Sequence, residues 1–173
     1  MNIELVDLKP ADFQFVKQVY DYYIKNSTAT FHTESVPVEE LGQTILTGHP
    51  RYRSFLILKD GQPCGFCYIS RYKPRQAYDR TAEVTIYLLP ETTGKGIGTI
   101  CLEMLETIAR DSDISVLIGV ITAENKTSVR LFEKCGYMKC AHYQRVGEKF
   151  NRVLDVVSYQ KLLENNTNFT GTE

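Results

Sequence analysis

The sequence predicts an α+β (α/β) domain in which helices cover both faces of a mixed central sheet. Three observations support this fold class. Short segments alternate apolar with polar residues, which is typical of strands. Other segments carry apolar residues three or four positions apart, which is typical of helices. Residues 116–121 are continuously apolar, as in a buried central strand.

The N-terminal part is expected to form a weakly alternating strand over residues 3–8 and then a helix that Pro10 opens. Residues 26–31 are loop-like, and Pro37 begins a second, shorter helix that runs to about Thr47. The first helix carries its apolar side chains near helical spacing, at Phe13, Val16, Tyr20, Tyr23 and Ile24.

A hairpin follows, with strands over residues 54–59 and 64–71 joined by a tight turn at Asp60–Gly61. The polar loop 72–78 leads to a long strand over residues 80–89. Cys64 and Cys67 form a C-x-x-C pattern inside the hairpin, but a zinc site would need a second ligand pair. We therefore interpret them as strand residues and expect no metal.

The C-terminal half is expected to begin with a helix over residues 98–110, before the strand 116–121. A fourth helix ends at Lys134, with Asn125 or Thr127 as its N-cap and Gly136 after its last turn. Strands over 137–146 and 152–160 complete the fold. The expected buried face of helix 98–110 consists of Ile100, Cys101, Met104, Leu105 and Ile108.

Composition sets the limits for organisation and location. The 173 residues are 43% hydrophobic and 24% charged, which suits one globular domain, expected over residues 1–163, with a flexible tail at 164–173. The net charge of −1 gives no electrostatic case for a nucleic acid or a membrane as partner. No apolar run could span a bilayer, and no signal peptide is evident. Five scattered cysteines indicate a reducing cytoplasm.

Glycines 94, 96 and 98 join the long strand to the helix after it. A turn of this kind directs free N–H groups and the positive end of a helix toward an anion, such as a phosphate. The spacing is neither G-x-G-x-x-G nor a P-loop, because Lys95 is followed by Gly96. The alternative is a flexible turn that only precedes a helix.

Two segments together resemble the GCN5-related N-acetyltransferase (GNAT) superfamily. The first is Thr93–Gly98, and the second runs from Asn125 to Gly136–Tyr137. Further motifs at Thr28–Phe31 and from Pro74 to Glu83 resemble its phosphinothricin acetyltransferase group. The resemblance implies a GNAT fold, acetyl-CoA as the donor, a small-molecule amine such as an amino acid or methionine sulfoximine as the acceptor, and a homodimer.

The resemblance also implies the cofactor-binding residues. The strand end offers backbone groups to the amide-bearing arm of the cofactor, and the glycine turn cradles its pyrophosphate. Asn125 is expected to contact the arm, to cap its helix, or both. The implied set is Ile86, Tyr87, Leu88, Gly94, Lys95, Gly96, Ile97, Gly98, Thr99, Asn125 and Ser128.

Two positions depart from the superfamily pattern. Thr93 stands where many members have Gln or Arg, which matters modestly because backbone N–H groups hold the phosphates. Phe132 stands where many have a Tyr that protonates the leaving thiolate. A thiol with a pKa near 8.5 leaves reasonably well without that acid.

Glu83 is the candidate general base, since the substrate ammonium must lose a proton before it attacks the thioester. In a strand Glu83, Thr85 and Tyr87 share one face, while the apolar residues between them pack on the other. Glu83 should therefore face the open side. The alternatives are a solvated carboxylate or a partner for Arg80.

The acceptor site is expected to contain a cation for a carboxylate and rings that frame a small side chain. Lys73 and Arg75 are the candidate cations, and Phe31 and Tyr78 the candidate rings. A surface loop is the alternative for the two cations. Other hypotheses for the protein are an acetyltransferase for a polyamine, an aminoglycoside or a protein N-terminus, and a non-catalytic acyl-CoA sensor.

Overall fold

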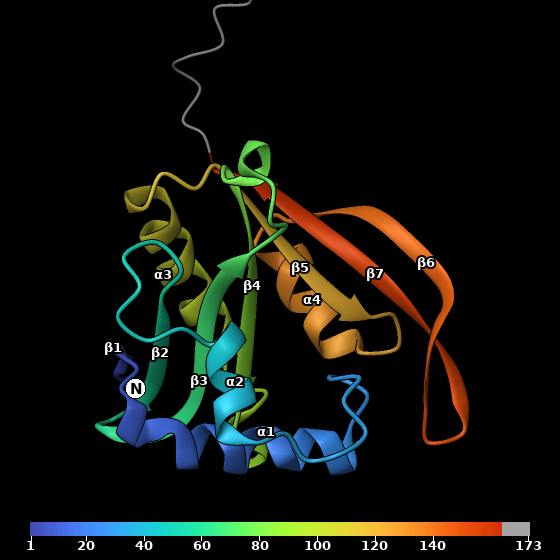
Figure 1. Ribbon diagram of the computed structural model, residues 1–173, viewed down its shortest axis with the longest axis horizontal. Coiled ribbons are helices and arrows are strands. Elements are labelled where there is room, and N and C mark those ends of the chain that lie inside the picture. Colours follow the sequence, from blue (N-terminus) through green and yellow to red (C-terminus); the bar gives the residue numbers. More distant parts are fainter. Residues whose placement is uncertain (164–173) are drawn as a thin grey trace, which may run out of the picture.

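Seven strands form one sheet with the order β1-β2-β3-β4-β5-β7-β6 (Figure 1). The computed structural model describes residues 1–163, so the tail predicted at 164–173 lies outside the described residues. The strands are β1 (Ile3–Asp7), β2 (Ser54–Lys59), β3 (Gln62–Arg71), β4 (Thr81–Leu88), β5 (Val116–Thr122), β6 (Met138–Lys149) and β7 (Arg152–Leu162). The helices are α1 (Phe13–Asn26), α2 (Val38–Thr44), α3 (Ile97–Asp111) and α4 (Lys126–Lys134).

The sheet is mixed because one of its pairings is parallel. β4 pairs with β5 in parallel, and every other neighbouring pair is antiparallel. The predicted Asp60–Gly61 turn joins β2 to β3, and both residues have the positive φ that a tight hairpin turn requires. This mixed sheet is the one that the sequence predicts.

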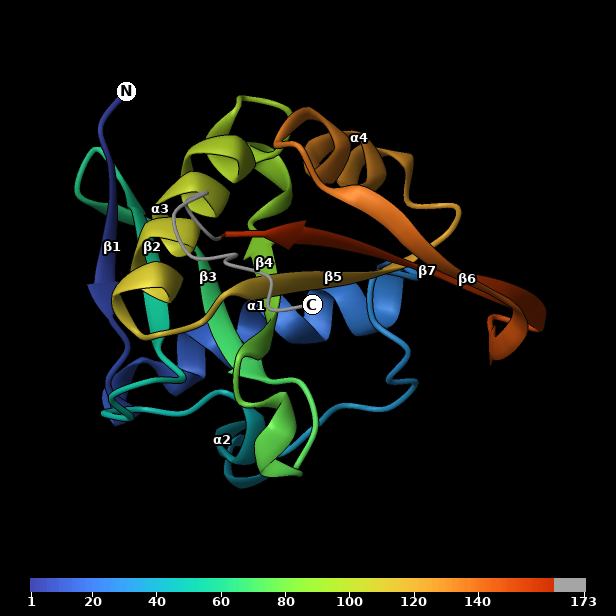
Figure 2. The ribbon, with the colours of Figure 1, turned by 90° about the horizontal axis from the view of Figure 1, so that it is seen from above.

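Helices cover both faces of the sheet, as predicted. Figure 2 shows α1 and α2 on one side and α3 and α4 on the other. Each side has its own apolar cluster. Phe66 packs with α1 and α2, whereas Val84 and Leu117 pack with residues of α3. Alternate residues of the central strands therefore belong to opposite layers.

The buried face of α3 differs from the predicted one. Ile100, Met104 and Ile108 are only half-buried. Cys101 and Leu105 are buried as predicted, together with Ile97, Leu102, Glu106 and Ala109. The apolar pattern predicted a different buried face because a charged residue such as Glu106 normally points to solvent. Its carboxylate is buried because it accepts hydrogen bonds from Lys161 Nζ at 3.0 and 2.8 Å.

The ends of other elements also differ from expectation. α2 ends at Thr44, and three 3₁₀ turns occur at Pro10–Asp12, Gln76–Tyr78 and Pro90–Thr92. β6 reaches Lys149, so it forms with β7 a long hairpin that projects from the body of the molecule (Figure 1). No helix within residues 1–163 is long and apolar enough to cross a membrane.

Candidate functional site

The sheet divides where β4 and β5 separate. Their parallel pairing covers only Thr81–Glu83 on β4 and Val116–Ile118 on β5. Beyond this point β4 continues beside β3 as far as Leu88, and β5 continues beside β7 as far as Thr122. The two halves of the sheet therefore diverge and leave a gap between them (Figure 1).

Backbone groups of β4 face this gap. The Arg80 carbonyl accepts the N–H groups of Ser115 and Val116 at 2.9 and 3.1 Å, so it points toward β5. Because backbone groups alternate along a strand, those of Val84, Ile86 and Leu88 point the same way. The Leu88 carbonyl accepts a hydrogen bond from the Tyr23 hydroxyl at 2.6 Å. An extended ligand with amide groups can pair with this edge as an added strand would.

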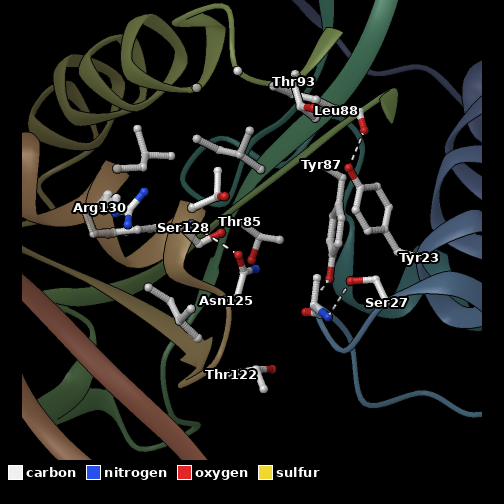
Figure 3. Close-up of a pocket in the computed structure, with 18 of the residues that line it drawn as sticks. Tyr23, Ser27, Thr85, Tyr87, Leu88, Thr93, Thr122, Asn125, Ser128 and Arg130 are labelled. Carbon is white, nitrogen blue, oxygen red and sulfur yellow. Dashed lines mark hydrogen bonds between the residues drawn. The ribbon is translucent and has the colours of Figure 1, made fainter. Parts of the chain in front are cut away.

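A cavity of about 910 Å³ fills the gap (Figure 3). Its wall combines residues of α1, β4, β5 and α4 with the turn before α3. The wall includes these predicted cofactor-binding residues: Ile86, Tyr87, Leu88, Gly94, Gly96, Gly98, Thr99, Asn125 and Ser128. Two of the set lie outside it. Lys95 is exposed and donates to the Glu91 carbonyl at 2.6 Å, and Ile97 is buried in the core.

The glycine turn adopts a backbone conformation that suits an anion cradle. Gly94 and Gly96 have φ of 73° and 82°, values that other residues rarely adopt. Gly96 is the N-cap of α3, so the free N–H groups of the first turn of α3 lie beside the cavity. A Cβ at Gly98 would stand 3.0 Å from Leu131, which shows how closely α3 approaches α4 here.

Helix α4 forms the opposite wall. Asn125 is its N-cap, and the Asn125 Oδ1 accepts the Ser128 N–H at 3.2 Å (Figure 3). The predicted cap is thus present, while a contact of Asn125 with a ligand stays a prediction. Arg130 and Lys134 also line the cavity and give its wall positive charge. Sequence reasoning missed these two cations, although both lie on the helix that the Asn125 motif opens.

Phe132 lines the cavity from the same helix. Its ring lies directly on Gly119 of β5, where an added Cβ would stand 2.3, 2.5 and 2.9 Å from three ring carbons. The ring also makes an edge contact with Tyr137, with centroids 4.9 Å apart. The Phe132 ring can therefore lie against β5 at this position because Gly119 has no side chain.

Glu83 lies at the point where the two strands separate. It is the last β4 residue paired with β5, opposite Ile118, and it pairs on its other side with Ser70. Its side chain shares a face with Thr85 and Tyr87 and is half-buried, outside the wall of the 910 Å³ cavity. Burial raises the pKa of its carboxyl above the ordinary value of 4.5.

Tyrosines share this face of the sheet with Glu83. Tyr68 lies opposite Thr85 on β3, and burial raises its pKa to about 12. The Tyr20 ring packs edge-on against Tyr87, with centroids 5.4 Å apart. The Tyr20 hydroxyl lies 2.6 Å from both Thr30 Oγ1 and His32 Nδ1. The sequence predicted that Tyr87 shares the face of Glu83, but it did not identify Tyr68 of β3 or Tyr20 of α1 as neighbours of Tyr87 on this side.

The predicted acceptor residues lie apart from one another. Phe31 is half-buried and packs against Gly147 of β6. The Lys73 ammonium lies over the rings of Tyr72 and Tyr78, 5.1 and 5.3 Å from their centroids. Arg75 is exposed at the start of the 3₁₀ turn that follows. None of the four predicted residues lines the 910 Å³ cavity.

The cysteines are free thiols. Cys64 and Cys67 lie in β3 as expected, and Cys101 lies in α3. Burial raises the pKa of each of these three thiols, that of Cys101 to about 12. Within residues 1–163, no group of three or more His, Cys, Asp or Glu side chains could hold a metal ion.

The chain is similar to acetyltransferases over most of its length. Residues 16–137 match the Acetyltransferase (GNAT) family. A phosphinothricin N-acetyltransferase of Streptomyces coelicolor is 30% identical over 162 residues, which are 91% of this chain and 91% of that protein. An L-methionine sulfoximine/L-methionine sulfone acetyltransferase of Pseudomonas aeruginosa is 25% identical over 95% of this chain and 96% of its own length.

A solved structure shares both the fold and the order of the elements. It is a phosphinothricin acetyltransferase from Sinorhizobium meliloti in complex with AcCoA, and it superposes with a TM-score of 0.88. The alignment covers all of this chain and 95% of that one, at 27% identity. An N-acetyltransferase from Staphylococcus aureus gives a TM-score of 0.85 at 25% identity, over 95% of this chain and 100% of that one.

Proposed function

Because the chain belongs to the acetyltransferase (GNAT) family, whose members use acetyl-CoA, we propose that it acetylates the amino group of a small amino acid or amino-acid analogue. The observation that carries this proposal is the gap between β4 and β5. One cavity there joins an anion cradle to a strand edge, and a half-buried carboxylate lies where the gap closes. We take residues 1–163 as one catalytic unit.

The donor side follows from the geometry of the cavity. The turn from Gly94 to Thr99 cradles the pyrophosphate of acetyl-CoA with backbone N–H groups and the N-terminus of α3. The edge formed by Ile86 and Leu88 pairs with the amide groups of the cofactor arm. Arg130 and Lys134 balance phosphate charge from α4. The thioester then lies near the closed end of the gap.

The chemical step is a direct acyl transfer. Glu83, directly or through a water molecule, takes a proton from the substrate ammonium, and the free amine attacks the thioester carbonyl. A backbone N–H on the edge of β4 stabilises the oxyanion. The attacking nitrogen then releases its second proton to solvent, the C–S bond breaks, and coenzyme A leaves as a thiolate that takes a proton from solvent. Phe132 offers no hydroxyl for that last step, and the moderate pKa of a thiol makes one unnecessary.

The proposed class of acceptor is based on the substrates in the relatives' names and on the residues that lie on the same face of the sheet as Glu83. The relatives are named for phosphinothricin and methionine sulfoximine, both small amino-acid analogues. The loop with Lys73 and Arg75 lies on the same face of the sheet as α2 (Figure 2), and Glu83 points to that face. We propose that these two cations bind the substrate carboxylate and that Phe31 and Tyr78 frame its side chain.

We further propose that the enzyme is a cytoplasmic homodimer. Five free cysteines suit a reducing compartment. The hairpin of β6 and β7 exposes apolar side chains that a second copy would cover, namely Tyr143, Val146, Phe150 and Val153. Light scattering coupled to size-exclusion chromatography tests the dimer, because a monomer at micromolar concentration contradicts it.

A thiol-release assay with acetyl-CoA tests the proposed function. The acceptors are a panel of amino acids, phosphinothricin, methionine sulfoximine and polyamines. We expect turnover with amino acids or their analogues and none with polyamines. Arg75→Ala should raise the KM for amino acids without changing the KM for acetyl-CoA. Turnover of polyamines alone would replace the substrate class, and no turnover with any amine would point to a non-catalytic acyl-CoA sensor.

A further inference from the structure

Lys149 of β6 is a buried cation that binds three backbone carbonyls. Its side chain is only 3% exposed. Its ammonium donates to the carbonyls of Ser27 and Thr30 at 2.7 and 2.8 Å, and lies 3.5 Å from that of Tyr23. These contacts use all three donors of the ammonium. Within residues 1–163 no carboxylate forms an ion pair with it, so the charge is stabilised by carbonyl dipoles and by the Phe150 ring, whose centroid lies 5.0 Å from Nζ.

The carbonyls belong to the end of α1 and to the segment after it. Residues 27–31, which we name the strap, leave α1 in an extended conformation, because Ser27 has φ of −148° and ψ of 156°. An extended exit leaves carbonyls at the helix end without the partners that a left-handed cap would supply. Lys149 supplies a donor instead, and its positive charge suits the negative end of the helix.

The turn of the hairpin places Lys149 at this position. Lys149 pairs with Arg152, and the two residues between them, Phe150 and Asn151, both have positive φ, of 53° and 55°. Such a turn fixes the register of the two strands. Asn tolerates this conformation, whereas for Phe it is strained. The strained turn therefore fixes Lys149 at the end of the arm formed by β6 and β7.

Gly147 contacts the strap from the same face of β6. Residues two apart on a strand share a face, so Gly147 and Lys149 both point toward the strap. A Cβ at Gly147 would stand 2.2 Å from the Phe31 ring. The missing side chain thus makes room for Phe31, the ring that we propose as a wall of the acceptor site. The hairpin of β6 and β7 thus supports the strap in two ways. The Lys149 ammonium binds carbonyls of the strap, and the missing side chain at Gly147 leaves room for Phe31.

The strap itself spans the gap between β4 and β5. On the β4 side the Tyr87 hydroxyl donates to the Ala29 carbonyl at 3.4 Å, and on the β5 side the Thr122 hydroxyl donates to the Thr28 carbonyl. Residues 27–29 line the 910 Å³ cavity. A shift of the strap therefore changes the wall of the cavity and the position of Phe31 together.

We propose that Lys149 and Gly147 are positioning residues for the acceptor site, and that the arm of β6 and β7 sets the specificity for the amine through the strap. Neither residue lines the cavity, so each acts through residues 27–31. This proposal rests on the proposed function where it names the acceptor, but the effect of the arm on the strap can be measured without any substrate.

Hydrogen–deuterium exchange measures that effect directly. Lys149→Met keeps the length of the side chain but leaves the Ser27 and Thr30 carbonyls without a donor. We expect amide exchange across residues 27–31 to be at least about tenfold faster in this variant, while peptides of α3 exchange as in the wild type. Lys139→Met, at an exposed lysine of the same strand, is the control and should leave the strap unchanged. Equal exchange in all three proteins overturns the proposal.

Steady-state kinetics then distinguish an effect on the amine acceptor from an effect on the acetyl-CoA donor. Lys149→Met and Gly147→Ala should each lower kcat/KM for the amine between about ten- and a hundredfold, because small displacements in the site cost that much. The KM for acetyl-CoA should change by a smaller factor than kcat/KM for the amine, because residues 27–29 are only a small part of the cavity wall. Lys149→Arg, which keeps a donor, should recover part of the loss. If both KM values rise equally and strap exchange is unchanged, the proposal is contradicted.

The two proposals fail in different ways. If the wild-type chain acetylates no amine, the proposed function is wrong, whereas faster strap exchange in Lys149→Met still supports the coupling between arm and strap. If the wild type acetylates amino acids and the variants keep wild-type kcat/KM, the proposed function stands and the role of Lys149 and Gly147 is wrong.

Discussion

Glu83 combines two properties that a general base needs, position and a raised pKa. It is the last residue at which β4 pairs with β5, so its carboxylate lies where the gap closes. Burial raises its pKa toward the pH at which an enzyme works, and a base is most effective when these two values are close. Alternation along the strand predicted that Glu83 shares a face with Thr85 and Tyr87, but alternation carries no information about burial depth.

Glu83→Gln should lower kcat/KM by about 10²-fold or more, since the amide cannot accept the proton. In the wild type, kcat/KM should rise with pH through the pKa of Glu83, above the ordinary value of 4.5. The variant should lack this acidic limb. A pH–rate profile measured for both proteins shows whether Glu83 is the general base. If the Gln variant keeps the limb, a different group is the base.

The same substitution should stabilise the fold at neutral pH. The folded-state pKa of Glu83 is raised, so protonation stabilises the folded state fully below the ordinary value of 4.5, and this contribution is lost as pH rises through the folded-state pKa. Glu83→Gln should therefore have a higher Tm than the wild type at pH 7, with the difference shrinking toward pH 4. Glu103→Gln, at an exposed position of α3, is the control for the loss of a carboxylate.

The contact between Gly119 and Phe132 can also be tested by substitution. Gly119→Ala would place a Cβ 2.3 Å from the Phe132 ring, so the ring must move into the cavity. We expect a loss of about 1–3 kcal/mol in the free energy of unfolding and a higher KM for acetyl-CoA. Adding Phe132→Leu to Gly119→Ala should recover part of the lost stability. Denaturant unfolding of the two single variants and the double variant measures this coupling.

At the scale of elements, the glycine turn and the hairpin turn offer a matched comparison. Gly96 and Gly61 have nearly equal φ, of 82° and 79°, and an added Cβ would meet no protein atom within 4 Å at either position. Alanine at each position should therefore cost a similar backbone strain, about 1–2 kcal/mol. Of these two glycines, Gly96 lines the cavity and Gly61 does not.

Gly96→Ala should therefore raise the KM for acetyl-CoA by about tenfold or more, whereas Gly61→Ala should leave it unchanged at the same loss of Tm. Isothermal titration with coenzyme A checks the binding step without any amine. Equal affinity in the two variants would mean that the turn starts α3 but does not cradle the cofactor.

The sequence predicted most elements because their signals are local. The two-residue alternation around Glu83, the cap at Asn125 and the left-handed residue Gly136 each act within a few positions of the chain. The strap could not be predicted, because it depends on hydrogen bonds between distant residues. Lys149 and Thr30 are 119 positions apart. For the same reason the cations of the loop 72–78 could be proposed from the motif but not placed relative to the cavity.

At the scale of the whole molecule, the divided sheet brings two layers to one gap. The cradle and α4 belong to the layer of α3 and α4, whereas Glu83, the tyrosines and the strap belong to the layer of α1 and α2. The donor and the acceptor can therefore approach the gap from opposite faces and be held together. This arrangement favours reaction in a ternary complex, because holding both reactants in line removes much of the entropic barrier.

Initial rates should accordingly give intersecting lines when both substrates are varied, as expected when no product leaves before both substrates bind. A covalent acetyl-enzyme would instead give parallel lines. The buried thiols are poor nucleophiles for that route, since burial raises the pKa values of Cys67 and Cys101 and keeps both protonated at neutral pH. Intact mass measured after incubation with acetyl-CoA alone should stay unchanged, and a stable acetyl adduct that forwards its acetyl group to the amine would contradict direct transfer.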